Sequence, residues 1–312
     1  MGVTSSSNLA IRFLMYVNIM LSNLKPHLLE MVSDSVRFIS TALETCGVAV
    51  KIGTSQLDPK ALNLFFDRFY IEPNFPAQMK SAGVKYGLVC SEVVSPDGTW
   101  NYGAEGGDPA TYAAFELAAK NAEFVWCMLE ESVEACTAIN PNTAYLPFGY
   151  LEKMATLKPL PEAERDIDFL MCGFPSDRRQ KLIGEISEEG HEVYYPAMPV
   201  PSYVRDSLME RSRVNLSIQK TTSHSIISVT RICHSVINHI PVLLEHNGAS
   251  NQYTELCLTM GSDEIVRRAS ECMADTDLVT FAEQSYQKLK SILPMDKTMA
   301  KILETTWPDR HD

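Results

Sequence analysis

The sequence lacks any pair of cysteines in the C-x-x-C spacing, although its 312 residues include eight cysteines. Cysteine pairs at that spacing are typical of zinc sites and redox-active disulfides, so their absence argues against both kinds of site. Several cysteines stand in apolar runs instead, among them Cys90 and Cys172. This pattern is typical of reduced, buried thiols, and it predicts a cytoplasmic protein.

Positive charge is also scarce. The chain has 27 Lys and Arg residues against 39 Asp and Glu residues, which gives a net charge of −12 at pH 7. An acidic surface repels phosphate backbones, so we expect no nucleic acid among the partners. A small anionic ligand stays compatible with this charge, because a few local arginines and helix N-termini can bind it.

Hydrophobic runs of membrane-spanning length are missing as well. The apolar stretch Leu9–Leu21 contains Arg12 and Asn18 and is too short to cross a bilayer. No basic region precedes it, as a signal peptide would require. It is therefore interpreted as a buried strand, and we expect no transmembrane segment.

The chain has no internal repeat, and what recurs in it is a strand, a polar turn and a helix. In the first half this pattern predicts strands at Ala10–Val17, Val48–Gly53, Val84–Cys90, Glu123–Cys127 and Thr143–Leu146, helices at Ser33–Cys46, Thr111–Ala119 and Glu130–Thr137, and a strand or helix at Ala61–Tyr70. The helix at Ser33–Cys46 is expected to begin at a cap formed by Ser33 and Asp34 and to be ended by Gly47. In the second half it predicts strands at Asp168–Cys172, Glu192–Tyr195, Val214–Ile218 and Pro241–Glu245, and helices at Arg178–Glu188, Tyr203–Arg211, Val229–Ile237, Ser262–Ala274 and Leu278–Leu293.

Strands that alternate with helices indicate an α/β fold with parallel sheets covered on both faces. The length suits two domains, and the Pro-containing stretch Leu157–Arg165 is typical of a linker. We therefore expect two Rossmann-like domains whose sheets face each other across a cleft. The predicted ranges are 1–155 and 166–277, with 278–312 packing back toward the first domain. Ligands of such sheets bind beyond the carboxyl ends of the strands.

Three segments in this order resemble the GT-B glycosyltransferases. Asn121–Gly149 resembles the end of their N-terminal domain, with its LPxG turn at Leu146–Gly149. Asp166–Arg179 resembles the first strand and turn of their donor-binding domain, and Arg231–Glu245 resembles a helix and strand of that domain. The spacing of these motifs is most similar to the CgeB-like bacterial glycosyltransferases (glycosyltransferase family 1 group). The resemblance implies a GT-B fold with a nucleotide-sugar site in the C-terminal domain.

The sequence departs from this pattern at acidic positions. His234 stands where the family has an acid, and His239 stands where it has a glycine. Retaining members often carry a pair of glutamates, and the positions of this pair are Ile226 and His234 here. Two alternatives therefore stay open: a catalytically inactive protein that binds nucleotide sugars or glycans, and a nucleotide-sugar epimerase of the same architecture.

Candidate donor-binding residues follow the predicted strands of the second half. A glycine lets phosphate approach the backbone, a helix N-terminus offers unpaired N–H groups, and an arginine can hold a diphosphate by two hydrogen bonds. Tyr195 is the candidate for stacking on a nucleobase, and Arg231 is expected to need an anion because it lies in an apolar helix. An ion pair with Glu245 is the alternative role for Arg231. The donor-binding candidates are Gly173, Arg178, Arg179, Tyr195, Ser217, Gln219, Ser223, His224, Ser225 and Arg231.

Candidate catalytic residues are Glu92 and His234. Glu92 follows the apolar strand Val84–Cys90, where a carboxylate is placed to act as general base for an acceptor hydroxyl. A packed histidine is the alternative interpretation of His234. The loop at 96–109 combines aromatic and acidic residues, as sugar-binding loops do. Its candidates for the acceptor side are Asp97, Trp100, Tyr102 and Glu105.

No metal ligand is predicted, because no D-x-D pair ends a strand. Asp166 and Asp168 form such a pair by letters but begin a predicted strand. Arginines and helix dipoles would then neutralise the leaving diphosphate in place of a metal. The sequence therefore predicts a metal-independent glycosyltransferase with no cofactor, which moves a hexosyl or related group from a nucleotide diphosphate sugar to an acceptor.

Overall fold

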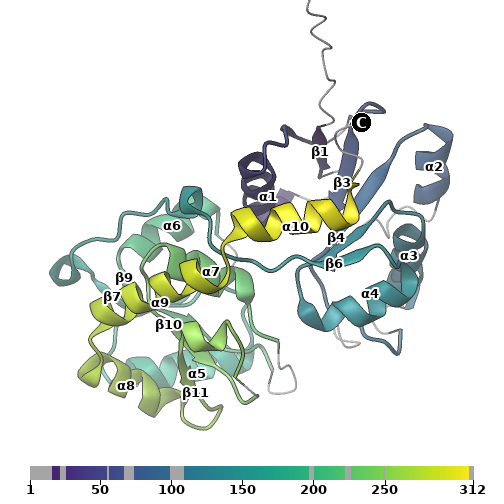
Figure 1. Ribbon diagram of the computed structural model, residues 1–312. Coiled ribbons are helices and arrows are strands. Elements are labelled where there is room, and N and C mark those ends of the chain that lie inside the picture. Colours follow the sequence, from purple (N-terminus) through teal and green to yellow (C-terminus); the bar gives the residue numbers. More distant parts are fainter. Residues whose placement is uncertain are drawn as a thin grey trace, which may run out of the picture. The chain divides into compact units, whose positions relative to one another are not determined.

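The computed structural model describes residues 16–21, 26–54, 56–66, 74–98, 109–196, 200–221, 226–248 and 250–308. The chain divides into two compact units (Figure 1). The first unit comprises Met1–Asn23, Leu43–Pro147 and Met299–Asp312, and the second comprises Leu24–Ala42 and Phe148–Thr298.

The first unit is built on a parallel sheet of six strands in the order β2-β1-β3-β4-β5-β6. These strands are β1 (Val17–Met20), β2 (Val50–Gly53), β3 (Leu62–Phe66), β4 (Tyr86–Cys90), β5 (Val125–Cys127) and β6 (Thr143–Tyr145). Parallel neighbours need crossover connections. The helices of this unit include α2 (Phe75–Ser81), α3 (Pro109–Lys120), the short η3 (Glu130–Ser132) and α4 (Val133–Ile139).

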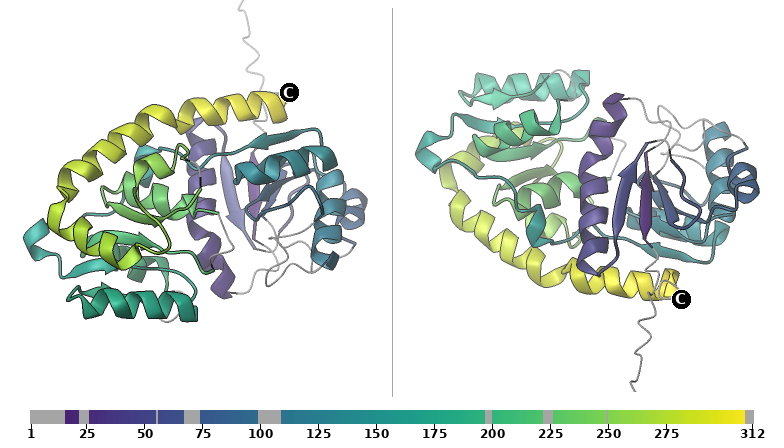
Figure 2. Two further views of the ribbon diagram at one scale, coloured as in Figure 1. Left: turned by 90° about the horizontal axis from the view of Figure 1, so that it is seen from below. Right: turned by 90° about the horizontal axis from the view of Figure 1, so that it is seen from above.

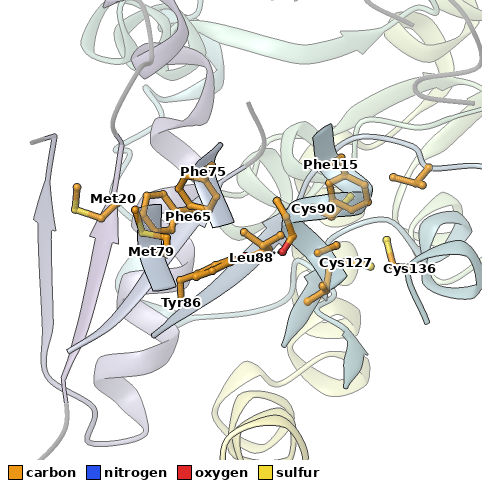
Figure 3. Packing of buried hydrophobic residues seen from close by; sticks show 14 of the residues in the cluster. Met20, Phe65, Phe75, Met79, Tyr86, Leu88, Cys90, Phe115, Cys127 and Cys136 are labelled. Carbon is orange, nitrogen blue, oxygen red and sulfur yellow. Dashed lines mark hydrogen bonds between the residues drawn. The ribbon is translucent and has the colours of Figure 1, made fainter. Parts of the chain in front are cut away.

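The core of the first unit forms where one face of this sheet meets α2, α3 and α4. Phe65 of β3 and Tyr86 of β4 pack edge-on against Phe75 of α2, with ring centroids 4.8 Å and 5.1 Å from it (Figure 3). Every residue of β4 is buried, which confirms the prediction of a strand enclosed on both faces. The Ala61–Tyr70 segment, predicted as strand or helix, forms a strand at β3.

The second unit contains a parallel sheet of five strands in the order β11-β10-β9-β7-β8. The strands are β7 (Ile167–Leu170), β8 (Val193–Tyr194), β9 (Ser212–Ser217), β10 (Val242–Glu245) and β11 (Leu258–Met260). The helices are α5 (Asp177–Glu188), α6 (Ser202–Glu210), α7 (Val229–Ile237), α8 (Ile265–Asp275) and α9 (Leu278–Ile292), with short 3-10 turns η4 (Glu152–Met154), η5 (Glu162–Glu164) and η6 (Thr254–Leu256).

Helices cover both faces of this second sheet, as Figure 1 shows. Phe169 of β7 belongs to a cluster with residues of α5 and α8, whereas Leu170 packs with Leu208 and Met209 of α6. Successive strand residues point to opposite faces, so this division places α6 opposite α5 and α8. Two α/β units with parallel sheets confirm the predicted fold class.

Helix α1 (Pro26–Thr45) is a single helix of 20 residues (Figure 2), so the prediction that it starts at a Ser33–Asp34 cap is wrong. The Ser33 hydroxyl donates to the carbonyl of Glu30 within the helix, and Asp34 forms an ion pair with Arg205. Proline at the first helical position suits a start at Pro26. The predicted end is confirmed, because Gly47 follows with a φ of 78°.

The C-terminal segment contains two helices where the sequence predicts one. Leu293 and Pro294 separate α9 from α10 (Met295–Thr306), as expected of a proline that ends a helix shortly before it. The N–H of Tyr150 donates to the carbonyl of Leu293, and the N–H of Met295 donates to Tyr150. Within the first unit, Trp126 Nε1 donates to Thr306 Oγ1 at 3.0 Å. None of the helices in the described ranges has the length and apolarity needed to cross a membrane.

Candidate functional site

A cavity of about 480 Å³ lies within the second unit. Its lining comes from the turn after β7, from helices α5, α6 and α7, from β9 and the loop that follows it, from the segment between β8 and α6, and from the part of α1 that belongs to this unit. Cavities of this size are typical of small-molecule sites. The carboxyl end of a parallel sheet is also where such sites are expected.

The turn after β7 carries Gly173 and leads into α5. Ser176 caps that helix, since its hydroxyl accepts from the N–H of Arg179 at 3.3 Å. A Cβ atom on Gly173 would stand 3.2 Å from Nη1 of Arg179 and 3.2 Å from Nη2 of Arg231. The missing side chain therefore lets two guanidinium groups approach one turn.

Neither of these two guanidinium groups has a carboxylate partner among the described residues. Arg179 donates to the carbonyls of Ile218 (2.9 and 2.7 Å) and Phe174 (2.7 Å). Arg231 donates to Ser217 Oγ at 3.1 Å and to the carbonyl of Cys172 at 2.5 Å. Both side chains therefore donate hydrogen bonds to neutral oxygens, and no carboxylate among the described residues pairs with their positive charges.

Burial makes these charges costly. Removal from water and the nearby Arg179 lower the pKa of Arg231 to about 10. Removal from water also lowers the pKa of Arg179, and Arg178 contributes to the same effect. A bound anion would offset this cost, because an opposite charge at a few ångströms favours the charged form of arginine.

Arg178 has a different environment from its neighbour Arg179. It forms a two-point ion pair with Glu245, with Nη1–Oε2 at 2.9 Å and Nη2–Oε1 at 2.5 Å. Glu245 is fully buried and also accepts from the N–H of Gln219 and from Ser262 Oγ. The alternative of an Arg231–Glu245 ion pair is therefore wrong, because Arg178 is the arginine that pairs with Glu245.

His234 lines the cavity and belongs to a charged group that the sequence did not reveal. Its Nε2 lies 3.4 Å from Asp206 Oδ1 and 3.5 Å from Arg205 Nη2, and its buried Nδ1 has no hydrogen-bond partner in the described chain. Arg205 also pairs with Asp34 of α1. Burial opposes ionisation of Asp206, but the hydrogen bond to His234 and the charge of Arg205 lower its pKa below the ordinary value.

Sequence reasoning missed Arg205, Asp206 and Asp34 for separate reasons. Arg205 and Asp206 lie in a helix with no motif, and Asp34 matched a helix-cap pattern. Arg205 and Asp206 follow the Gly173 turn within the donor-binding domain that the resemblance implied, and α5 and β8 lie between them and that turn. This placement was the one available signal that they could belong to the site. Nothing local connects Asp34 to Arg205, which is 171 positions away along the chain.

The other predicted donor residues have the following positions. Tyr195 donates its hydroxyl to the carbonyl of Phe174 at 3.0 Å, and Ser217 is the buried acceptor of Arg231. The backbone of Gln219 bonds both Arg178 and Glu245. His239 has a φ of 55°, the left-handed conformation that favours glycine. Ser223, His224 and Ser225 lie outside the described residues.

The predicted catalytic and acceptor residues of the first half belong to the first unit. Glu92 is partly buried two residues after β4, and its carbonyl accepts from Ser132 Oγ at 2.9 Å. Asp97 is exposed in a turn closed by a bond from the N–H of Gly98 to the carbonyl of Ser95. Trp100, Tyr102 and Glu105 lie outside the described residues.

Asp166 and Asp168, which form the D-x-D pattern after the predicted linker, both take part in ion pairs. Asp166 pairs with Arg211, and Asp168 pairs with Arg213 at 3.3 Å. In the part of the chain that the structure describes, no three His, Cys, Asp or Glu side chains are grouped as a metal ion requires.

A substitution at Gly173 tests the convergence of the two guanidinium groups. Alanine there would contact both at 3.2 Å, so each must move by a few tenths of an ångström. We expect Gly173→Ala to weaken binding of inorganic pyrophosphate by roughly 3- to 10-fold, because small displacements of positioned groups are costly. Gly184→Ala on α5 is the control, since nothing lies near its added methyl group. Calorimetry that finds equal affinities in both variants would contradict the assignment.

Comparison with known proteins gives a fold and no family. No protein-family model and no curated protein matches the sequence. Among solved structures, OtsA in its apo form matches with a TM-score of 0.58 at 10% identity, over 94% of this chain and 99% of that one. A Listeria monocytogenes protein assigned as a UDP-N-acetylglucosamine 2-epimerase matches with a TM-score of 0.55 at 10% identity, over 96% and 98%.

A third similar structure is the UDP-forming α,α-trehalose-phosphate synthase of Burkholderia xenovorans. It has a TM-score of 0.51 at 12% identity, over 82% of this chain and 75% of that one. Identities this low establish architecture alone. The chain therefore has the GT-B fold, as predicted, and membership of the CgeB-like group stays a prediction.

Proposed function

We propose that this protein is a glycosyltransferase that uses a nucleoside diphosphate sugar, with the diphosphate bound at the Gly173 turn between Arg179 and Arg231. The observation that supports this most strongly is the convergence of two guanidinium groups, both without a carboxylate partner in the described chain, at 3.2 Å from one point on a glycine turn. Planar guanidinium groups suit phosphate oxygens, which accept paired hydrogen bonds.

The charge of the cavity agrees with an anionic ligand group. Four cationic side chains line it, namely Arg179, Arg205, Lys220 and Arg231, against the two carboxylates Glu30 and Asp34. Asp206, which pairs with Arg205, reduces this excess to one positive charge, in a chain whose net charge is −12. Positive charge that is concentrated at the cavity favours an anion bound there over a general attraction of anions to the protein surface.

The chemistry that follows is departure of a nucleoside diphosphate from the anomeric carbon of the sugar. Negative charge develops on the leaving oxygen, and fixed guanidinium groups in a site with little water stabilise it. Within the proposal, Tyr195 contacts the base and the hydroxyl-rich segment at 223–225 supports the diphosphate, whereas Arg178 and Gln219 bond Glu245 and each other and support the site without contacting the ligand. Glu92 would accept the proton of the acceptor hydroxyl, and His234 would act near the donor.

The proposal also includes a binding site for the acceptor substrate. The loop that contains Asp97, Trp100, Tyr102 and Glu105 would bind the acceptor, which is a glycan, a small molecule or a protein. We also propose the cytoplasm as the location and 1–155 and 166–277 as the functional domains, with 278–312 packing back toward the first.

A nucleotide-sugar epimerase is the second candidate. The specific observation in its favour is the structural match to a protein assigned as a UDP-N-acetylglucosamine 2-epimerase, which extends over 96% of this chain. The glutamate positions of retaining glycosyltransferases are occupied by Ile226 and His234, which favours neither outcome by itself. An inactive binding protein would use the same cavity.

The decisive experiment begins with a thermal-shift screen of UDP-, GDP- and dTDP-sugars. A ligand at 100 times its Kd should stabilise the folded protein by about 2.7 kcal/mol. The best ligand is then incubated with the protein, with and without candidate acceptors. Release of nucleoside diphosphate supports transfer, recovery of an isomeric nucleotide sugar supports the epimerase, and binding without turnover supports the inactive protein. No binding to any member of the panel would overturn the proposal.

Removal of metal tests the proposed replacement of a metal by arginine. We expect full glycosyl transfer in the presence of EDTA, because Arg179 and Arg231 would carry the charge that a metal carries in other glycosyltransferases. The rate of nucleoside diphosphate release is measured before and after dialysis against EDTA. Loss of activity that Mg²⁺ or Mn²⁺ restores would show that the leaving group depends on a metal.

A further inference from the structure

Helix α1 contributes a second, acidic side to the cavity. Glu30 and Asp34 are one helical turn apart and both line the cavity, opposite in charge to Arg179 and Arg231. The two carboxylates face α6 through different contacts. Asp34 pairs with Arg205, and Glu30 Oε2 accepts from the N–H of Ser202 at 3.2 Å.

The two carboxylates differ in how many of their oxygens have a partner among the described residues. Both oxygens of Asp34 bond Arg205. Glu30 uses Oε2 for the first N–H of α6, while Oε1 has no partner among the described residues. Glu30 is exposed and lines the cavity, so Oε1 is open to a ligand there.

Apolar surface accompanies this open carboxylate. Met31 on α1 and Phe174 after the Gly173 turn line the same cavity, and each side chain is 45% exposed. A sugar ring combines hydroxyl donors at its edge with a C–H face that packs on such side chains. A phosphate group has neither feature, and a carboxylate repels it.

We propose that Glu30 recognises the sugar portion of the ligand, with Oε1 accepting hydrogen bonds from ring hydroxyl groups and Met31 and Phe174 covering the ring. This inference rests on the proposed function, because it assigns the diphosphate to Arg179 and Arg231. The opposite charges of the two sides orient the ligand within the cavity. Glu30 is thus a residue that determines sugar specificity and takes no part in holding the diphosphate.

The test compares a nucleoside diphosphate with its sugar ester in the full-length protein. The probes are UDP, UDP-glucose and UDP-N-acetylglucosamine, with GDP and GDP-mannose as a second set, and Kd is measured by calorimetry. Glu30→Gln keeps an acceptor for Ser202 but replaces a charged acceptor with a neutral one. Glu44→Gln, an exposed position of α1 that does not line the cavity, is the control with the same change of charge.

We expect Glu30→Gln to lower the affinity for the sugar esters by about 10-fold, because a charge-assisted hydrogen bond to the sugar is lost. The affinity for the free nucleoside diphosphate should stay within about twofold of the wild-type value. Glu44→Gln should change neither affinity. Equal losses for ester and free diphosphate, or no loss for either, would overturn the assignment of Glu30 while the proposed function stands. Wild-type protein that binds neither these five probes nor any other member of the thermal-shift panel would overturn both.

Discussion

Arg231→Ala is expected to lower the affinity for a nucleoside diphosphate sugar by about 10- to 150-fold, which corresponds to roughly 1.5–3 kcal/mol for a charge-assisted contact. The side chain lines the cavity beside Gly173 and has no carboxylate partner in the described residues, so an anion is its missing counterpart. Arg231→Lys should recover only part of the affinity, because a point charge cannot replace the planar guanidinium group.

The matched control for this variant is Arg211→Ala. Arg211 also lies in the second unit, but it is exposed, pairs with Asp166 and does not line the cavity. Its removal should leave the Kd unchanged. Calorimetry gives the affinity, and circular dichroism confirms that each variant is folded. A folded Arg231→Ala protein with wild-type affinity would remove the residue on which the proposed function depends.

Glu245→Ala is expected to destabilise the second unit by about 3–5 kcal/mol, because it leaves a partly buried guanidinium group without its partner. Glu245 has no exposed surface and accepts from Arg178, Gln219 and Ser262 at the end of β10. For a unit of this size the melting temperature should fall by roughly 10 °C or more.

Two variants make this expectation specific. Glu255→Ala removes a carboxylate from an exposed pair with Lys288, and it should cost less than about 1 kcal/mol. Arg178→Met combined with Glu245→Leu replaces both charges by apolar groups and should recover most of the stability. Scanning calorimetry measures all three proteins. If the Glu245→Ala protein has the same melting temperature as the wild type, the Arg178–Glu245 pair does not stabilise the fold.

The architecture was predictable because it depends on local patterns. The continuous apolar run at Val84–Cys90 predicted β4 as a buried strand, and alternation of strands with helices predicted two parallel sheets. The glycine at position 47 predicted the end of α1, since a left-handed residue terminates a helix wherever the helix stands. Such signals act over a few residues and survive in any tertiary context.

The individual roles of the charged residues were decided by tertiary structure. Arg178 and Arg179 are adjacent in the sequence, but side chains on one helix diverge by about 100° per residue. Arg178 therefore pairs with Glu245, whereas Arg179 turns to the carbonyl of Ile218 beside Gly173.

The acidic side of the cavity also depends on contacts between segments that are distant in the sequence, so the sequence did not reveal it. Ser33 and Asp34 match a capping pattern, but they lie inside α1, where Asp34 pairs with Arg205. Arg205 is 171 positions away along the chain, and no local pattern indicates a partner at that separation. The sequence by itself determined two parallel α/β units and a glycine turn between a strand and a helix. Only the folding of distant segments onto that turn decided which arginines lack a carboxylate partner, and which carboxylate has an oxygen without a partner, among the residues that the structure describes.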